Sequence, residues 1–348
     1  NVLDGADTLL IVNGGSITPD AGEAVSSGNA GNTVLMSGNA VINSSDLFAI
    51  LHAGADATTT LSDTASILIN GGKGVLNDGA SSLFTMTGDS EIFMQSTFSS
   101  AAIGNSGARD AAKGTTHVLH MQDNSKITVY SESNAILLEG AGHSVILEDF
   151  AYVDKLTDVT EKKSSYATVF VGGNRNSIAL SDASSIRNGG KKSAAPTISV
   201  EGNRNTISLS DTAAISNDGK LQPDELNSSE TILVNGNNNV LTASGSAEIT
   251  GFNRVIFMQG TGNKVSILED ALVAAEGNHQ PSAIFMDDVL DYDITISGNA
   301  RVTSESDFDN NAAIYVAGVS SGKIDISGSA ELESKGPYAA GINVSTFE

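Results

Sequence analysis

Short runs of alternating apolar and polar residues recur along the chain. Between Ile207 and Ile215, the apolar side chains of Ile207 and Leu209 alternate with serines, which is the period of two typical of a β-strand. Asp211 interrupts this pattern, and both aspartate and glycine tolerate the backbone angles of a tight bend. Ala213 and Ile215 then restore the apolar pattern. The segment therefore predicts two short strands joined by a sharp bend.

The same nine-residue motif occurs eleven times with varying fidelity. Its central residues run from position 38 to position 328 in ten intervals, an average of 29 residues. A fixed motif at a drifting spacing is typical of a solenoid, whose coils carry loops of different length. Besides 207–215, the copies lie at 34–42, 59–67, 84–92, 119–127, 145–153, 178–186, 241–249, 265–273, 294–302 and 324–332.

A second strand with its own corner precedes each motif. It reads Thr-Ile-Ser-Val-Glu-Gly-Asn at 197–203, and similar segments occur at 168–174 and 231–237. Asparagine accepts left-handed backbone angles, and asparagines stacked between coils can form hydrogen-bonded ladders. Each coil should therefore contain a strand, a Gly-Asn corner, a strand, an Asp or Gly bend, a third strand and a variable loop. We expect the variable loops around 152–166, 187–196, 216–230, 276–292 and 303–311.

These elements predict an all-β fold, a parallel β-helix of about eleven to twelve rungs that takes in residues 1–348 as one domain. At roughly 4.8 Å per rung, eleven rungs give a rod of about 50 Å.

The composition narrows the function classes. The chain has 41 acidic and 18 basic residues, a net charge of −23, which disfavours nucleic acid and anionic lipid as partners. No apolar run approaches the length of about 18 residues that a membrane helix needs. The absence of cysteine excludes disulfides, thiolate catalysis and cysteine-type zinc sites. The absence of tryptophan and the small share of aromatic residues argue against an enzyme that holds sugars on aromatic platforms.

No segment has the pattern of a catalytic site. Gly88-Asp89-Ser90 is followed by Glu91, where a serine-protease motif needs glycine. His117 and His120 are three residues apart on an expected strand, so they face opposite sides, and we expect the five histidines to lie mostly on the surface. We predict no catalytic residue, no metal and no cofactor.

Two charged segments are the candidate binding sites. Nine of the 18 basic residues fall between 155 and 220, and Arg175 and Arg204 occupy the same place in adjacent Gly-Asn corners. This positive band could hold an acidic glycan or the acidic face of another copy; alternatively, nearby carboxylates neutralise it. The dense carboxylates near 287–293 could recruit Ca²⁺, or form a solvated acidic loop. The candidate residues are Arg175, Arg204, Lys162, Lys163, Lys191, Lys192, Asp287, Asp288 and Asp291.

The Gly-Asn-x-Asn corners, the Ile-x-Leu-Ser-Asp/Gly-x-Ala-x-Ile motif, the lack of cysteine and the acidic balance together resemble the passenger domains of Gram-negative autotransporters, in particular the adhesin and self-associating group. This resemblance implies a right-handed β-helix that is secreted through the outer membrane and displayed on the cell surface. The chain departs from the family pattern, since it shows no strict short repeat, signal peptide, translocator barrel or protease domain. It reads as a segment of a longer protein.

We expect a non-enzymatic surface adhesin that acts by many polar contacts along the rod. The expected partners are another copy of the chain or a host glycan or protein, in aggregation, biofilm formation or attachment. The alternatives are a β-helical enzyme that degrades polysaccharide and a passive stalk that presents another domain.

Overall fold

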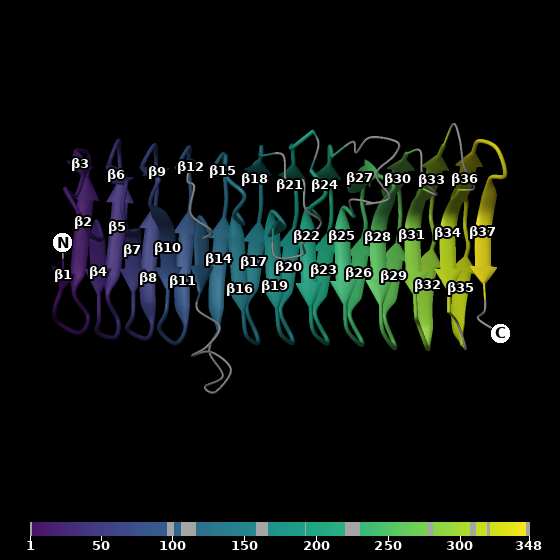
Figure 1. Ribbon diagram of the computed structural model, residues 1–348, viewed down its shortest axis with the longest axis horizontal. Helices are drawn as coiled ribbons and strands as arrows, with labels where there is room; N and C mark the ends of the chain where they lie inside the picture. Colours follow the sequence, from purple (N-terminus) through teal and green to yellow (C-terminus); the bar gives the residue numbers. More distant parts are fainter. Residues whose placement is uncertain are drawn as a thin grey trace.

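The computed structural model describes residues 2–95, 101–105, 116–157, 166–191, 193–219, 230–277, 281–306, 311–318 and 321–345. Within these residues the chain forms a parallel β-solenoid, and the coils follow one another along one axis with the two termini at opposite ends (Figure 1). The described part contains no α-helix, and hence no helix long and apolar enough to cross a membrane. The predicted fold class is confirmed, whereas the hand of the coil stays a prediction.

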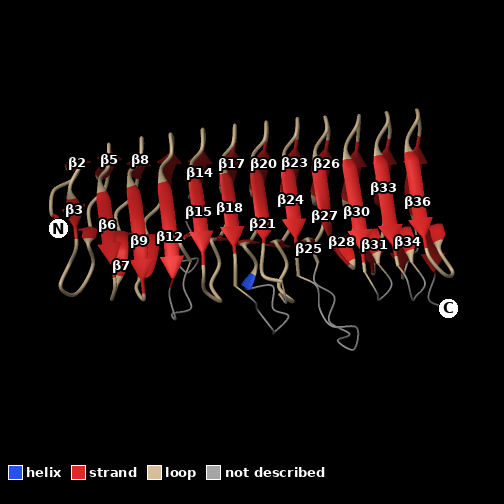
Figure 2. Ribbon diagram, turned by 90° about the horizontal axis from the view of Figure 1, so that it is seen from above, coloured by secondary structure: helices blue, strands red, loops and turns tan. Residues whose placement is uncertain are grey.

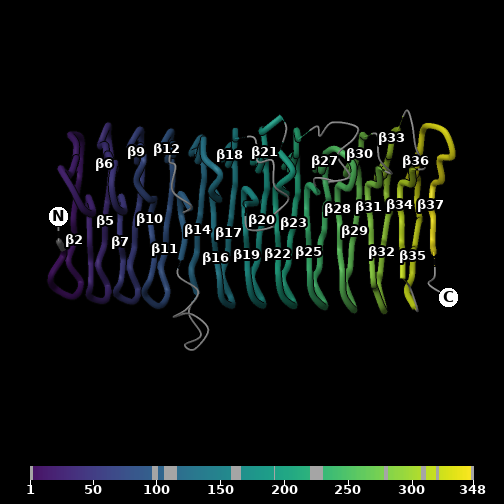
Figure 3. Tube along the Cα trace, in the orientation of Figure 1, coloured from purple at the N-terminus to yellow at the C-terminus, as the bar shows by residue number. Residues whose placement is uncertain are grey.

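Three parallel sheets, which we call A, B and C, form the sides of the solenoid. Every third strand belongs to the same sheet, so that each coil contributes one strand to each sheet. Figure 2 shows the strands side by side from above, and Figure 3 follows the chain from coil to coil. Because parallel strands need a crossover connection, this coiling is what allows strands of only two to six residues to pair.

Sheet A has thirteen strands in the described residues. They are β1 (Val2–Leu3), β4 (Val25–Ser27), β7 (Phe48–His52), β10 (Lys73–Asn77), β13 (Ile103–Asn105), β16 (Ile136–Glu139), β19 (Val169–Gly172), β22 (Ile198–Glu201), β25 (Ile232–Asn235), β28 (Arg254–Gln259), β31 (Ser282–Asp287), β34 (Ala312–Ala317) and β37 (Ala340–Ser345).

Sheet B has twelve strands in the same part of the chain, and it follows sheet A after the Gly-Asn corner. They are β2 (Leu9–Asn13), β5 (Thr33–Ser37), β8 (Ala57–Leu61), β11 (Ser82–Met86), β14 (His117–Met121), β17 (Ser144–Leu147), β20 (Ser177–Leu180), β23 (Thr206–Leu209), β26 (Val240–Ala243), β29 (Lys264–Ile267), β32 (Tyr292–Ile296) and β35 (Gly322–Ile326).

Sheet C, also with twelve described strands, follows the Asp or Gly bend. They are β3 (Ser16–Ile17), β6 (Val41–Ser44), β9 (Ser66–Asn70), β12 (Glu91–Gln95), β15 (Lys126–Val129), β18 (Tyr152–Lys155), β21 (Ser185–Asn188), β24 (Ala214–Asn217), β27 (Glu248–Phe252), β30 (Leu272–Glu276), β33 (Arg301–Glu305) and β36 (Glu331–Lys335).

The core is a set of apolar columns parallel to the axis. In sheet B, Ile178 pairs in register with Ile207, which pairs with Leu241, and all three side chains are buried. In sheet C, Ile186 and Ile215 form the equivalent pair. Burying such a side chain contributes about 1.5–3 kcal/mol relative to leaving it exposed. The nine-residue motif therefore builds two sides of the core, as its alternation predicts.

Sheet A also carries apolar side chains on its outer face. Leu233, Phe257 and Phe285 form a second small cluster outside the main core, with Tyr315 packed against it. The guanidinium carbon of Arg254 lies 4.0 Å from the centroid of the Phe285 ring, a cation–π contact that covers part of this cluster.

The second cluster explains an error in the predicted loops. Strand β31 lies inside the loop predicted at 276–292. The prediction missed it because its residues are apolar on both faces and therefore show no alternation. Strand β18 likewise occupies the start of the loop predicted at 152–166, and the buried Lys155 at its end broke the expected apolar pattern.

Candidate functional site

The corner between sheets A and B contains a glycine with positive φ and, two residues later, a left-handed residue. Arg175 and Arg204 both have a φ of 60°, and Asn238 occupies the same place in the next coil with a φ of 57°. The amide of Arg175 donates to the carbonyl of Asn203, and the amide of Arg204 donates to that of Asn237, so each corner is fixed by the following one. The predicted stacking of the two arginines on adjacent coils is confirmed.

A buried asparagine ladder supports these corners from inside. The backbone amide of Asn176 donates to Oδ1 of Asn205 at 2.8 Å, and that of Asn205 donates to Oδ1 of Asn239 at 2.8 Å. The Nδ2 group of Asn205 donates to the carbonyl of Gly173 at 3.0 Å. Because these side chains are buried, their hydrogen bonds satisfy backbone groups that water cannot reach. The predicted ladders therefore exist, and they are structural.

A second, outer ladder runs through the asparagine of each Gly-Asn pair. Oδ1 of Asn174 accepts from the amide of Asn203, and Oδ1 of Asn203 accepts from the amide of Asn237, both at 2.7 Å. Oδ1 of Asn237 accepts from the amide of Thr261 at 2.7 Å. The amide oxygens are thus occupied within the solenoid, which orients each side chain and leaves its Nδ2 donor for other partners.

A groove lies over this row of corners. Its volume is about 380 Å³, and it is lined by Ala141, Asn174, Arg175, Asn203, Arg204, Asn237 and Asn238. Both arginines are exposed, and within the described residues neither guanidinium forms an ion pair with a carboxylate. Neutralisation of these two arginines by nearby carboxylates, the alternative to a binding role, therefore does not occur in the described structure. We call these lining residues the corner groove.

The other basic residues of the 155–220 stretch that the structure describes do not join this groove. Arg187 lies on the outer face of sheet C, where it pairs with Asp218 and, at 3.7 Å, with Asp154. Lys155 is fully buried, its Nζ donates to the carbonyl of Tyr166, and burial lowers its pKa to about 7. For the basic residues that the structure describes, the prediction of one continuous positive surface is therefore wrong, because they lie on different sides of the solenoid.

The predicted lysines are dispersed or lie outside the described residues. Lys191 is exposed in the loop after β21 and lines a separate cavity of about 710 Å³ with Asp218, Phe252 and Glu276 among others. The remaining candidates, Lys162, Lys163 and Lys192, lie outside the part of the chain that the structure describes.

The acidic candidates lie on the same row of corners as the arginines, between β31 and β32. Asp287 accepts a hydrogen bond from Nε2 of Gln259 at 3.3 Å, and Oδ1 of Asp291 accepts from the Ser321 hydroxyl at 2.5 Å. Asp288 and Asp291 are exposed and left-handed, with φ of 51° and 53°. Among the described residues, no three His, Cys, Asp or Glu side chains are grouped as metal ligands.

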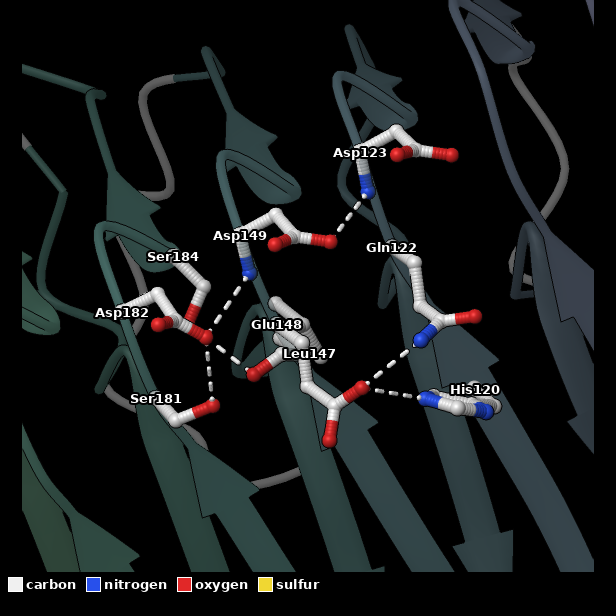
Figure 4. A network of polar contacts seen from close by, with 9 residues as sticks. All are labelled: His120, Gln122, Asp123, Leu147, Glu148, Asp149, Ser181, Asp182 and Ser184. Carbon is white, nitrogen blue, oxygen red and sulfur yellow. Dashed lines mark hydrogen bonds and ion pairs between the residues drawn. The ribbon is translucent and has the colours of Figure 1, made fainter.

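A carboxylate ladder that we did not predict runs along the bends between sheets B and C. Oδ2 of Asp149 accepts from the amide of Asp123 at 3.1 Å, and Oδ2 of Asp182 accepts from that of Asp149 at 3.3 Å (Figure 4). Beside it, Oε2 of Glu148 accepts from His120 and Gln122, and these bonds lower the pKa of Glu148. In the sequence, Asp recurs at this place in successive copies of the motif, but the motif alone predicts only a backbone role for it, since the partner of each carboxylate lies one coil away.

The expected surface position of the histidines is wrong for three of them. His52, His117 and His143 are buried, because the sheet A–sheet B corner encloses a polar column that the asparagines continue. His52 bonds to the hydroxyls of Ser27 and Thr59, each at 2.8 Å, and burial lowers its pKa to about 4. His120 points outward, so the prediction that His117 and His120 face opposite sides is confirmed.

Comparisons with models of known protein families, with curated proteins and with solved structures find no match to this chain.

Proposed function

We propose that this chain is the adhesive segment of a bacterial surface protein of the autotransporter passenger type, and that it is not an enzyme. It attaches to another copy of itself or to a host surface by many modest polar contacts along the solenoid. The observation that carries this proposal is the repetition of exposed polar groups once per coil, at places fixed by the backbone. The corner groove and the carboxylate ladder are the two clearest examples.

Repetition is what makes such contacts effective. An exposed polar or charged pair contributes only about 0.2–1 kcal/mol. When several pairs sit on one rigid element, the first contact raises the effective concentration of the next, and the total affinity rises steeply. A rod that carries hydrogen-bond donors and acceptors at a regular spacing, once per coil, is suited to this kind of attachment, either to other copies in aggregates or to a host surface.

The chemistry of the corner groove favours binding over catalysis. Its lining contains no carboxylate or histidine that could act as a general acid or base. Ser90, in the segment that partly matches a protease motif, is fully buried. A passive stalk would have no reason to hold two unpaired arginines in a groove, which favours an adhesive segment over that alternative.

Particles coated with the purified chain test the proposal. We expect them to clump with one another, or to attach to cultured host cells, at low and moderate salt. Particles coated with an unrelated acidic protein of similar charge serve as the control. Neither clumping nor attachment would overturn the proposal, and release of fragments from a polysaccharide by the pure chain would favour the enzyme alternative.

A further inference from the structure

We infer that the corner groove binds a linear anionic polysaccharide, carboxylated or sulfated, which lies along the solenoid axis and across Arg175 and Arg204. This inference rests on the proposed attachment function and names a ligand for it.

The groove offers more donors than free acceptors. Within the described residues, the Nδ2 groups of Asn174, Asn203 and Asn237 have no hydrogen-bond partner, and their Oδ1 atoms are already used by backbone amides. The guanidinium groups of Arg175 and Arg204 add donors that carry a full positive charge. A ligand that matches this lining must be rich in acceptors and negatively charged.

Both arginines occupy positions whose left-handed backbone angles disfavour arginine. A side chain with a Cβ atom is strained at a φ of 60°, and Asn238 shows that asparagine serves at the same corner. Left-handed residues other than glycine recur at bends along the whole described solenoid and most of them are Asp or Asn, whereas the two arginines among them both lie in this groove. The two arginines are therefore better explained by a ligand than by the needs of the fold.

The repeat of the groove fits a linear chain of sugars. Its donors recur at the coil spacing of about 4.8 Å, a distance similar to the advance per sugar unit in an extended polysaccharide. Guanidinium forks bind carboxylate and sulfate oxygens in pairs, which fixes an acidic sugar opposite each arginine. The amide donors of the asparagines beside them are suited to ring hydroxyls.

A thin polysaccharide fits better than the acidic row of a second copy. The carboxylates of Asp149 and Asp182 each have one oxygen engaged by the preceding bend. A second copy would also bring the rest of a chain with a net charge of −23 against this one. A thin polyanion contacts little of the protein beyond the groove, so the negative charges elsewhere on the solenoid repel it far less than they repel a second copy.

Binding of two defined polymers tests the inference. We expect immobilised chain to bind polygalacturonate, which carries only carboxylates, or κ-carrageenan, which carries only sulfates. Polygalacturonate with its carboxylates methyl-esterified should not bind. The double variant Arg175→Asn/Arg204→Asn should weaken binding about tenfold or more. Its thermal unfolding should be unchanged or raised, because asparagine suits the left-handed corner.

A charge-matched control separates the groove from the net charge. Arg187→Gln/Arg301→Gln removes the same two charges from sheet C, and it should leave binding within twofold of the wild type. Equal losses in both double variants would overturn the inference, as would the absence of binding to both polymers.

The outcomes also separate this inference from the proposed function. If neither polymer binds but the Arg175→Asn/Arg204→Asn variant no longer clumps, the groove contacts a second copy; the inference is then overturned and the adhesive function stands. If a polymer binds through the groove but coated particles neither clump nor attach, the inference stands and the adhesive function fails.

Discussion

At the scale of single residues, the left-handed corner positions determine which side chains the solenoid presents. The corner glycines show the tightest case. A Cβ atom on Gly202 would lie 2.0 Å from the carbonyl oxygen of Gly173, and one on Gly236 would lie 2.1 Å from that of Gly202. Only glycine fits there, and it holds the neighbouring Asn and Arg residues at one fixed height per coil.

Lys155 places a titratable amine inside the core at the same scale. Its pKa is lowered from 10.5 to about 7 by burial, so the folded chain binds fewer protons than the unfolded chain between these two pH values. Stability therefore rises with pH across the window from about 7 to 10.5, and the cost of the buried charge is present in full below it.

The variant Lys155→Met should be more stable than the wild type at pH 6 by about 3 kcal/mol, since it removes this cost. The difference should shrink as the pH rises from about 7 to 10.5 and level off above that range, where the lysine is neutral in both states. Denaturant unfolding at several pH values measures it. Lys126→Met, on the same sheet at a partly exposed ion pair, is the control and should show no such trend. A constant difference for Lys155→Met would contradict the assigned cause.

At the scale of elements, the two asparagine ladders differ in burial and therefore in energy. Asn205 accepts one hydrogen bond and donates another inside the solenoid, whereas the side chain of Asn203 accepts one bond at the surface. Loss of a partner leaves a buried backbone group unsatisfied, but an exposed group can turn to water.

We expect Asn205→Ala to destabilise the chain by about 3 kcal/mol and Asn203→Ala by about 1 kcal/mol or less. The two residues lie two positions apart in one corner, so each variant controls for the other. Urea unfolding followed by circular dichroism gives the comparison. Equal effects would show that the inner ladder contributes no more than the outer one.

At the scale of the whole molecule, the coils depend on their neighbours, and within the described residues β37 pairs with β34 alone. In β37, Ile342 and Val344 are 42% and 50% exposed, whereas Ile215 in the middle of the solenoid is fully buried. In a linear array each coil is stabilised by nearest-neighbour contacts, so the stability of the isolated 348-residue segment should fall towards β37.

Hydrogen exchange should therefore be faster in β35 and β37 than in β23 and β24, by about tenfold or more. Mass spectrometry of peptides after exchange measures this, and repetition at several protein concentrations controls for association at the ends. Uniform protection at every concentration would mean that the solenoid opens as one cooperative unit.

The candidate site was only partly predictable from the sequence. The shared place of Arg175 and Arg204 could be read from the aligned Gly-Asn corners. The sequence does not show that the Nδ2 groups of Asn174 and Asn203 are free, because this depends on which atom of each side chain the next coil engages. The buried histidines were missed for a similar reason, since single histidines carry no periodic pattern.

The sequence by itself determined most of the strands, the bends and the order of the three sheets, because alternation and left-handed tolerance act within a few residues. Only the tertiary structure decided which charges share a side of the solenoid. Neighbours on one side are a whole coil apart in the sequence, while residues close in the sequence turn to different sides. Arg175 and Arg187 are separated by twelve positions, yet one lines the corner groove and the other is paired on sheet C.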